Sequence, residues 1–340
     1  MSEPINLQIR LTERPNGKLS PKHFATSQSE IPPVEDGKLL VRTVLLSLDA
    51  ANRAWMQGPT YRRAVKPGDV MHGYGLGEVM ASGSSAFAAG DIVACETGWQ
   101  NYSLVDAGEA VKQIDHRPLS HLLSVLGIAG KTAYHGLLGI GQPQPGETVV
   151  VSAAAGSVGV YVGQLAQMRG ARAVGIAGGR EKCDWLTGTL GFDAAIDYKS
   201  ADMLAELKAH CPKGIDVYFD NVGGPVLEAV LFNMAMGGRV VCCGAVSQYD
   251  TGDMASPRGI PGLIVVKRLR MEGFIVLDER HDDQRASADL LAWSTSGKLR
   301  VVDTILDGLE SAPGGLIGLL AGENMGKWLV QVGADPQGSS

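Results

Sequence analysis

The pattern of hydrophobic and polar positions changes along the chain at about residue 126. Before it, short alternating runs such as Lys38–Leu48 and Gly90–Ala94 stand between turns rich in Pro, Gly and Asp, which is typical of an irregular, mostly β region. After it, apolar runs of strand length alternate with stretches whose apolar positions recur at helical spacing. Because strands that alternate with helices form βαβ units, we predict an α/β fold with a parallel sheet for the second region.

The predicted elements of this second region follow one another closely. Strands are expected at Glu147–Ser152, Ala171–Ala177, Ala194–Asp197, Ile215–Asn221, Gly238–Gly244 and Met271–Leu277. Helices are expected at Val158–Arg169, Glu181–Leu190, Ala201–His210, Pro225–Met234 and Asp282–Ser296. We therefore expect a Rossmann domain, which is a doubly wound parallel sheet, over residues 126–299, and a β-rich domain over 1–125 that is completed by 300–340.

Composition narrows the class of protein. A length of 340 residues suits two domains, and 30 Lys and Arg against 36 Asp and Glu give a net charge of −6, which disfavours nucleic-acid binding. No apolar run reaches about 18 residues, so no membrane-spanning helix is expected. The start of the chain lacks the features of a secretory signal, and the five scattered cysteines suit reduced thiols, so we expect a cytoplasmic location.

The strand that ends at Ser152 leads into a glycine-rich turn. Gly156 and Gly159 match the last two glycines of the pattern G-x-G-x-x-G, while Ala154 stands at the first. Small residues let the backbone turn sharply beside a pyrophosphate, whose charge is stabilised by the amides of the helix N-terminus. Since the motif lies between a strand and a helix, we predict a dinucleotide site; the alternative is a glycine-rich connection without a nucleotide.

The end of the second predicted strand indicates which dinucleotide binds. NAD sites usually carry an acidic residue there to hold the ribose 2′-OH, but this chain reads Ala177-Gly178-Gly179-Arg180-Glu181-Lys182. A 2′-phosphate would be attracted by Arg180 or Lys182, whereas Glu181 weakens this interpretation. We expect NADP(H) rather than NAD; the alternative for Lys182 is a solvated lysine on a helix surface.

The sequence offers no pattern for metal or nucleophilic catalysis. Cys95 stands apart from any histidine, His72 has no Glu or Cys at ligand spacing, and the seven histidines are scattered. A G-x-S-x-G motif is also missing. We therefore expect no metal, and hydride chemistry that a cofactor carries while the protein orients and polarises the substrate.

Several stretches of the sequence resemble one protein family. They are Gly98–Tyr102, Gly130–Leu138, Gly146–Gly159, Gly175–Cys183, Leu190–Lys199, Cys211–Gly224, Cys243–Tyr249, Met271–Val276 and Gly318–Lys327. The chain resembles the zinc-independent branch of the medium-chain dehydrogenase/reductases, in the group of prostaglandin reductases, curcumin reductase and plant alkenal double-bond reductases. This resemblance implies a GroES-like β-rich domain, formed by the N-terminal third and the C-terminal tail, together with a Rossmann domain, usually in a homodimer.

The resemblance also implies which residues contact NADP(H). The pyrophosphate would lie over Ala155, Gly156, Ser157 and Val158, beside Gly159. The adenosine 2′-phosphate would be held by Lys182 and Tyr198. The ribose and nicotinamide would be lined by Asn221, Cys243, Gly244, Ala245, Val246, Ser247, Phe274, Ile275, Val276 and Asn324.

The reaction implied by the resemblance is the NADPH-dependent reduction of the C=C bond of an α,β-unsaturated ketone or aldehyde. Hydride adds to the β-carbon, and the enolate that results takes a proton at the α-carbon. A tyrosine hydroxyl, neutral at pH 7, suits the stabilisation of the enolate oxygen. Tyr74 matches a G-Y-G segment of the plant reductases, Tyr249 matches a substrate-side tyrosine, and Tyr61 is a weaker third candidate. The alternative for each is a packed ring with a hydrated hydroxyl.

The first domain departs from the family at one stretch. Members commonly read Leu-Ser-x-Asp-Pro-Tyr-Met-Arg, whereas residues 46–53 read LSLDAANR. One wall of the pocket is therefore expected to be smaller and more polar, with Asn52, Trp55 and Tyr61 as candidate substrate contacts. The expected partner is a small enone, enal or quinone, with neither a nucleic acid nor a membrane. Two alternatives stay open, namely an NADPH-dependent quinone reductase and a non-catalytic NADPH-binding or sensor protein.

Overall fold

The computed structural model describes residues 5–200, 202–250, 260–278 and 283–336. The chain divides into two compact units. Unit 1 comprises Met1–Leu123, Asp303–Glu323 and Trp328–Ser340, and unit 2 comprises Ser124–Val302 and Asn324–Lys327. The domain limits expected from the sequence, at 125/126 and 299/300, remain a prediction.

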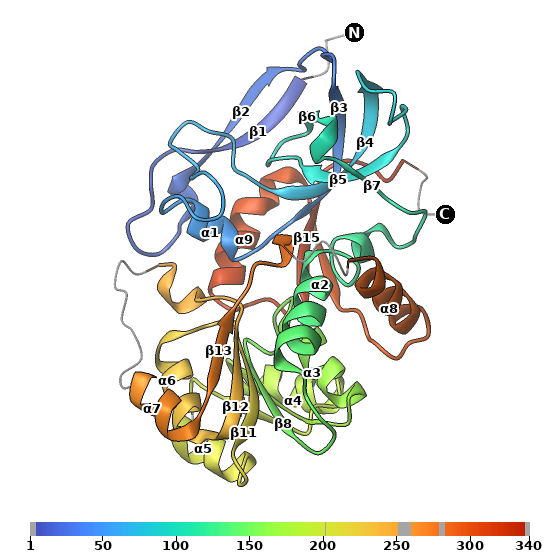
Figure 1. Cartoon of the computed structure of the whole chain (residues 1–340). Helices are drawn as coiled ribbons and strands as arrows, with labels where there is room; N and C mark the ends of the chain where they lie inside the picture. The colour runs from blue at the N-terminus through green and yellow to red at the C-terminus, as the bar shows by residue number, and fades with distance from the viewer. Residues whose placement is uncertain (1–4, 201, 251–259, 279–282, 337–340) are drawn as a thin grey trace. The chain divides into compact units, whose positions relative to one another are not determined.

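Unit 2 is built on a six-stranded parallel sheet with the strand order β10-β9-β8-β11-β12-β13 (Figure 1). The strands are β8 (Thr148–Ser152), β9 (Arg172–Ala177), β10 (Ala194–Asp197), β11 (Ile215–Asp220), β12 (Met234–Cys242) and β13 (Arg270–Gly273). Counted from β8, this is the order 3-2-1-4-5-6 of the Rossmann fold, so the predicted fold class is confirmed. The order reverses between β8 and β11, and ligands of such sheets bind at the carboxyl ends of the strands there.

The helices of unit 2 connect successive strands. They are α2 (Ile128–Tyr134), the π-helical segment η4 (His135–Gly141), α3 (Gly159–Met168), α4 (Arg180–Gly188), α5 (Met203–His210), α6 (Gly224–Asn233), α7 (Ile260–Lys267) and α8 (Asp283–Thr295), with short 3-10 turns η5 (Val246–Gln248) and η6 (Val276–Asp278). The five predicted helices correspond to α3, α4, α5, α6 and α8, although two of their expected first residues, Ala201 and Asp282, lie outside the described residues. The segments α2, η4 and α7 have no counterpart among the predicted helices.

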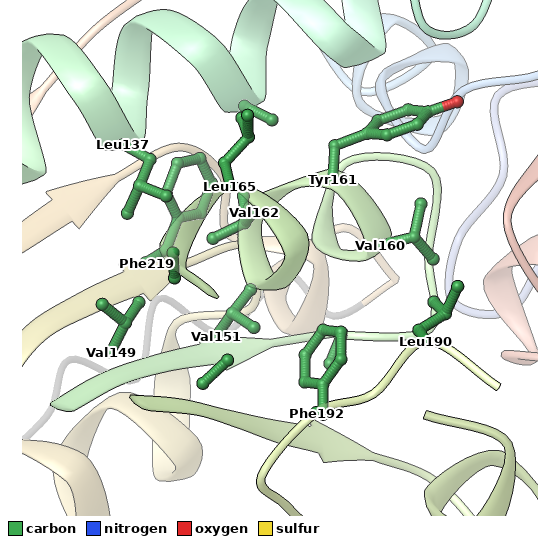
Figure 2. Close-up of a cluster of buried hydrophobic side chains, with 14 of the residues drawn as sticks. Leu137, Val149, Val151, Val160, Tyr161, Val162, Leu165, Leu190, Phe192 and Phe219 are labelled. Carbon is green, nitrogen blue, oxygen red and sulfur yellow. The ribbon is translucent and has the colours of Figure 1, made fainter. Parts of the chain in front are cut away.

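Apolar layers cover both faces of this sheet. Successive residues of β8 point to opposite faces, so Val149 and Val151 belong to one buried cluster and Val150 to the other. Figure 2 shows the first cluster, in which side chains of α3 pack over the strand. Gly163 of α3 lets the helix approach closely, because an added Cβ would lie 1.9 Å from Cζ of Phe192. Burial on both faces explains why β8 reads as a continuous apolar run.

The sixth strand is shorter than expected. The prediction of a strand over Met271–Leu277 is wrong in its second half, because β13 ends at Gly273. The next residue, Phe274, instead packs its ring edge-on against Phe219, at 6.5 Å between ring centroids. This ring fills the space beside Gly136 in η4, where an added Cβ would lie 2.7 Å from Cζ of Phe274. The packing of the Phe274 ring against distant residues therefore decides where the strand ends, although the apolar run in the sequence continues to Leu277.

Unit 1 contains an antiparallel sheet with the strand order β14-β15-β3-β4-β5-β7, in which β6 also pairs with β3, and a separate β1–β2 pair (Figure 1). The strands are β1 (Ile5–Leu11), β2 (Phe24–Glu30), β3 (Lys38–Ser47), β4 (Tyr74–Ser82), β5 (Ile92–Glu96), β6 (Tyr102–Asp106), β7 (Val111–Lys112), β14 (Asp303–Asp307) and β15 (Lys327–Gln331). The helices are α1 (Ala51–Trp55) and α9 (Ala312–Leu320), with 3-10 turns η1 (Pro21–His23), η2 (Ala107–Glu109), η3 (Leu119–Leu122) and η7 (Leu309–Ser311). Across the parts of the chain that the structure covers, no helix is both long and apolar enough to cross a bilayer.

Candidate functional site

The turn between β8 and α3 has no room for larger side chains. A Cβ on Gly159 would lie 2.4 Å from the carbonyl oxygen of Ala153 and 2.7 Å from Cα of Ala154. A Cβ on Gly156 would lie 3.1 Å from the same Ala153 oxygen, which is tight but less severe. Ala153 itself has φ +49°, so the chain turns through the left-handed region there. This tight turn brings the N-terminus of α3 to the switch point, where backbone amides attract an anion.

The alanine that replaces the first motif glycine is accommodated by a glycine on the neighbouring strand. Ala154 is fully buried, and a Cβ on Gly175 of β9 would lie 2.8 Å from the Cβ of Ala154. The same added Cβ would lie 3.0 Å from Cδ1 of Leu186. The close packing that the motif glycine normally permits is therefore provided from the facing strand.

A segment near the C-terminus of the chain joins this turn. The Gly326 amide donates to the Ala155 carbonyl at 2.8 Å, and Gly326 forms a parallel bridge with Gly156. Gly326 has φ +71°, and a Cβ there would lie 2.2 Å from the Val302 carbonyl oxygen, so only glycine fits. The Asn324 side chain is 8% exposed, and its amide donates to the Gly326 carbonyl at 3.0 Å. The segment thus brings the predicted residue Asn324 next to Ala155 and Gly156.

The carboxyl end of β9 gathers the residues predicted for the 2′-phosphate. The Lys182 ammonium is half-buried and donates to the Asn324 carbonyl at 2.5 Å. Tyr198 lies against the same loop, since a Cβ on Gly178 would lie 2.9 Å from its ring. Arg180, the other candidate cation, is exposed and lies 3.5 Å from the carboxylate of Asp184. Lys182 and Tyr198 therefore meet at one strand end.

Asp197, at the end of β10, belongs to the same loop and was not singled out from the sequence. Its carboxylate accepts hydrogen bonds from the Gly179 amide at 2.7 Å, the Lys199 amide at 3.0 Å and the Ser200 hydroxyl at 2.8 Å. These hydrogen bonds, the Gly179 amide first, hold the pKa of Asp197 below its usual range. The ionised carboxylate thus fixes the backbone of the loop that precedes Lys182.

The ends of β8, β11 and β12 bring a second group of predicted residues together. The Asn221 side chain donates to the Ser152 carbonyl at 2.8 Å. The amides of Cys243 and Gly244 donate to the Asp220 carbonyl at 2.9 and 3.0 Å, and the Val246 amide donates to the Asn221 carbonyl at 3.3 Å. Of the remaining loop residues, Ala245 is half-buried and the Ser247 hydroxyl donates to the Val222 carbonyl. The loop after β12 is therefore tied to Asn221 through backbone hydrogen bonds.

Asp220 organises this strand end, and sequence reasoning did not identify it. Its buried Oδ1 accepts from the Tyr218 hydroxyl at 2.8 Å, the Ser152 hydroxyl at 3.2 Å and the amides of Val222 and Gly223 at 3.0 and 2.8 Å. Burial raises the pKa of Asp220, and the hydrogen bonds from the two amides oppose that rise. The only signal in the sequence is an Asp–Asn pair at the carboxyl end of a buried strand.

Tyr249 lies just beyond the loop, at the end of η5. Burial raises the pKa of its hydroxyl, and a hydrogen bond with the Ala245 backbone partly opposes the shift. The neighbouring Cys243 has its pKa raised to about 12 by burial, so its thiol stays protonated at neutral pH. Phe274, Ile275 and Val276 follow β13 and are each half-buried. At this end of unit 2, Tyr249 is thus a neutral hydroxyl donor.

In unit 1, Tyr74 starts β4 opposite Glu96 of β5. The glycines on both sides of it are sterically required. A Cβ on Gly73 would lie 2.6 Å from the side chains of Leu46 and Trp99, and one on Gly75 would lie 2.5 Å from the Leu45 carbonyl. The backbone of the G-Y-G segment therefore packs closely against Leu45, Leu46 and Trp99, and Tyr74 is half-buried.

The candidate substrate residues of unit 1 differ in exposure. Asn52 is 1% exposed, and its side chain accepts from the Asp49 amide and donates to the His72 carbonyl at 3.0 Å. Trp55 is also buried, whereas Tyr61 is 53% exposed and meets the Trp55 ring edge-on. The guanidinium of Arg62 lies 4.3 Å from the centroid of Trp55 and pairs with Glu96 at 2.8 Å. Arg62 and Glu96 were missed because nothing in the sequence relates positions so far apart.

Among the described residues, no group of three or more His, Cys, Asp or Glu side chains is arranged to hold a metal ion. The expectation that the reaction needs no metal remains a prediction.

Comparisons with known proteins agree with the fold described above. A family model described as the N-terminal domain of oxidoreductase matches residues 7–114, and one described as zinc-binding dehydrogenase matches residues 157–293. The NADPH-dependent curcumin reductase of Escherichia coli (strain K12) is 41% identical over 96% of both chains. The NADP(+)-dependent 2-alkenal reductase of Nicotiana tabacum is 41% identical over 88% of this chain and 89% of its own.

A solved structure of CurA from Vibrio vulnificus, in complex with NADPH, has a TM-score of 0.92 and 41% identity, and the match covers 97% of this chain and all of that one. Both the fold and the sequence are therefore shared over nearly the whole length. The chain belongs to the medium-chain dehydrogenase/reductase family, in its group of curcumin, alkenal and prostaglandin reductases.

Proposed function

We propose that the chain catalyses the NADPH-dependent reduction of the C=C bond of α,β-unsaturated ketones or aldehydes. The observation that carries the proposal is the end of β9, where Gly178, Gly179 and the Lys182 ammonium stand in place of the acidic residue of NAD sites. The relatives named for NADPH-dependent reduction of curcumin and of 2-alkenals support the reaction class.

The residues present fit the cofactor. The Gly156–Gly159 turn is so tight that a Cβ on Gly159 would clash with the backbone of Ala153 and Ala154, as expected of the sharp glycine turn of a pyrophosphate site. An ammonium and a tyrosine hydroxyl, from Lys182 and Tyr198, suit a 2′-phosphate. Asn221, held to the Ser152 carbonyl, is fixed at the switch point where the nicotinamide half would bind.

The chain must support the chemistry that follows hydride transfer. Bound NADPH would supply the hydride, which adds to the β-carbon of the substrate. The electron pair of the C=C bond then moves toward the carbonyl oxygen, and the α-carbon takes a proton. A neutral hydroxyl that donates to this oxygen lowers the barrier. The Tyr249 hydroxyl keeps its proton at neutral pH, since an ordinary tyrosine has a pKa of about 10 and burial raises the pKa of Tyr249 further. Tyr249 is therefore our first candidate and Tyr74 the second.

A substrate panel tests the proposal. The absorbance of NADPH is followed with alkenals, aryl enones, prostaglandin-like enones and quinones. Consumption with enones or enals at a higher kcat/KM than with quinones is expected. A preference for quinones would favour a quinone reductase, and tight NADPH binding without turnover on any compound would indicate a non-catalytic protein. Prior treatment with EDTA should leave the rate unchanged, and a loss of rate would revive a metal site.

Replacing Tyr249 by phenylalanine should lower kcat on enones roughly a hundredfold, the usual scale for the loss of one acid or oxyanion donor. The dissociation constant of NADPH, measured by fluorescence, should stay unchanged, because the ring remains. Tyr74→Phe should act in the same direction, whereas Tyr102→Phe on β6 serves as a matched control. If neither candidate variant slows turnover, the proton comes from cofactor hydroxyls and water.

We also propose that the chain forms a homodimer through the exposed edge of the unit 2 sheet. β13 is the last strand of that sheet, and an open edge strand is a template for pairing with a second copy. Next to it, α7 presents Val265 and Val266, which are 74% and 65% exposed. Lys267 fastens α7 to the end of α6 by donating to the Phe232 and Met234 carbonyls. Exposed apolar side chains of this kind mark interaction surfaces.

The double variant Val265→Glu and Val266→Glu should halve the mass measured by light scattering, because two carboxylates would be buried without partners. Val111→Glu is the control, since Val111 is 56% exposed on β7 of unit 1. A wild-type chain that is already monomeric, or a variant that stays dimeric, would contradict this interface.

A further inference from the structure

The carboxylate of Asp220 is buried at the end of β11, and the proposed reaction gives it no role. The residue is only 2% exposed. A buried carboxylate is costly unless hydrogen bonds replace the water that it has lost. The next residue in the chain is Asn221, which is proposed to line the nicotinamide half of the cofactor. The surroundings of Asp220 therefore bear on how that half of the site is held.

Four hydrogen bonds converge on one oxygen of this carboxylate, Oδ1. The amides of Val222 and Gly223 donate to it at 3.0 and 2.8 Å, as in an Asx turn. The hydroxyls of Tyr218 and Ser152 donate to it at 2.8 and 3.2 Å. Four converging donors favour the ionised carboxylate, which only accepts hydrogen bonds. Asp220 thus holds both the turn that leads into α6 and the end of β8.

Ser152 is fully buried and connects Asp220 with Asn221. Its hydroxyl donates to Oδ1 of Asp220, while its oxygen accepts from the Asn221 backbone amide at 2.9 Å. The Phe219 carbonyl, at 3.5 Å, is a more distant acceptor for the same hydroxyl. A serine hydroxyl has a single proton. Since the carboxylate takes that proton as a hydrogen bond, the lone pairs of the oxygen are directed to the Asn221 amide.

Ser152 also fixes which end of the Asn221 side chain faces a ligand. The Ser152 carbonyl, 2.8 Å away, can only accept, so the side-chain NH2 must point to it and the side-chain oxygen must point away. Asn221 is half-buried, and this oxygen accepts no hydrogen bond from the part of the chain that the structure describes. An available acceptor at the switch point suits a hydroxyl or an amide donor of a dinucleotide.

The groups that surround the carboxylate are uncharged at neutral pH. The backbone carbonyl of Asp220 accepts from the amides of Cys243 and Gly244 at 2.9 and 3.0 Å, which brings two thiols close. Burial raises the pKa of Cys243 to about 12 and that of Cys242 to about 11. Burial also raises the pKa of Tyr218 well above its usual value. Hydrogen bonds, including the one from Ser152, therefore stabilise the charge of Asp220.

We propose that Asp220 and Ser152 are positioning residues, in which the carboxylate orients the Ser152 hydroxyl and Ser152 holds Asn221 with its side-chain oxygen toward the cofactor. The inference rests on the proposed function, because it takes NADPH as the ligand that Asn221 meets. It deepens that function by naming two groups that act through Asn221. Hydrogen bonds of this kind hold a binding side chain in its productive geometry before the ligand arrives.

Ser152→Ala removes the connection and leaves Asp220 and Asn221 in place. In the chain without cofactor, the Asn221 backbone amide should exchange with deuterium at least about tenfold faster, because it loses its acceptor. NMR of the full chain labelled with ¹⁵N-asparagine measures this rate, and the signal is identified by its loss in Asn221→Ser. The dissociation constant of NADPH, from protein fluorescence, should rise at least about tenfold. An unchanged exchange rate would overturn the proposal.

Asp220→Asn tests whether the carboxylate acts through Ser152. The variant keeps the shape and removes the charge, and it should change the exchange rate and the NADPH constant in the same direction. Tyr218→Phe is the matched control, because its hydroxyl donates to the same Oδ1 but not to Asn221. It should lower the unfolding temperature and yet change the NADPH constant by no more than about twofold. If Asp220→Asn does not fold, Ser152→Ala and Tyr218→Phe together still decide the question.

The outcomes separate this inference from the proposed function. The proposal fails if Asp220→Asn folds and leaves both readouts at their wild-type values, or if Tyr218→Phe weakens NADPH as much as Ser152→Ala does. It also fails if Asn221 is loosened while NADPH binds as tightly as before. A wild-type chain that does not bind NADPH at all would contradict the proposed function and the contact with the cofactor. In that case a faster exchange in Ser152→Ala would still support the hold of Ser152 on Asn221.

Discussion

Replacing Gly159 by alanine should weaken NADPH binding by about a hundredfold or more. The added Cβ would meet the Ala153 carbonyl oxygen at 2.4 Å and Cα of Ala154 at 2.7 Å, which are backbone atoms of a tight turn that cannot rotate away. To relieve these contacts the turn must move away from the position in which its amides meet the pyrophosphate. Overpacking of this kind costs about 3 kcal/mol at the upper end of its usual range, and the same free energy lost from binding corresponds to roughly a hundredfold in affinity. A titration of protein fluorescence with NADPH measures the change.

Alanine substitutions at two further glycines should weaken NADPH binding less than Gly159→Ala does. Gly156→Ala should be milder, because its nearest contact would be 3.1 Å from the same oxygen. Gly188→Ala, at the exposed end of α4, should match the wild type, since an added Cβ meets nothing within 4 Å. Circular dichroism separates a loss of binding from a loss of fold. A Gly159→Ala chain that is folded and binds NADPH normally would show that the turn does not contact the cofactor.

Lys182→Ala should remove most of the preference for NADPH over NADH. A charge-assisted hydrogen bond is worth about 1.5 to 3 kcal/mol, so NADPH should bind roughly 10- to 150-fold more weakly. The lysine also donates to the Asn324 carbonyl at 2.5 Å, and loss of that hydrogen bond would loosen the loop for both dinucleotides equally. The ratio of the two dissociation constants therefore isolates the contribution of the 2′-phosphate.

The control for this experiment is Arg180→Ala. The Arg180 side chain is 92% exposed and lies 3.5 Å from the carboxylate of Asp184, a surface pair of small energetic value. Its removal should change neither constant by more than about twofold. If Lys182→Ala weakens NADPH and NADH to the same extent, the lysine acts only on the loop, and another group must recognise the phosphate.

Local pattern was enough to predict the fold of unit 2. Each βα unit there buries an apolar strand and one face of a helix, so the periodicity in the sequence reports the packing directly. The strand Ala194–Asp197 was predicted with the limits it has as β10. The failures occur where a distant contact decides the structure, as at Phe274, whose ring leaves the sheet to pack against Phe219 and Gly136. No periodicity in residues 271–277 carries that information.

The sequence could predict the part of the candidate site that lies at the ends of predicted strands. Asn221 and the loop after β12 could be placed because ligands bind at the carboxyl ends of parallel strands. The role of Asp220 could not be predicted, because it depends on four donors outside the Asp220–Asn221 pair, among them the Ser152 hydroxyl 68 residues away. In unit 1, the Arg62–Glu96 pair that covers Trp55 likewise joins two segments that share no motif.

The position of Asn324–Lys327 has a consequence for biosynthesis. The glycine-rich turn, complete as a motif by residue 159, acquires its partner at Gly326 only after residues 160–326 have been synthesised. A nascent chain still attached to the ribosome can assemble the strands of unit 2 and yet lack the segment that anchors Lys182 and borders Ala155. A chain cut before residue 324 would therefore lack both the backbone partner of Ala155 and the carbonyl that Lys182 contacts.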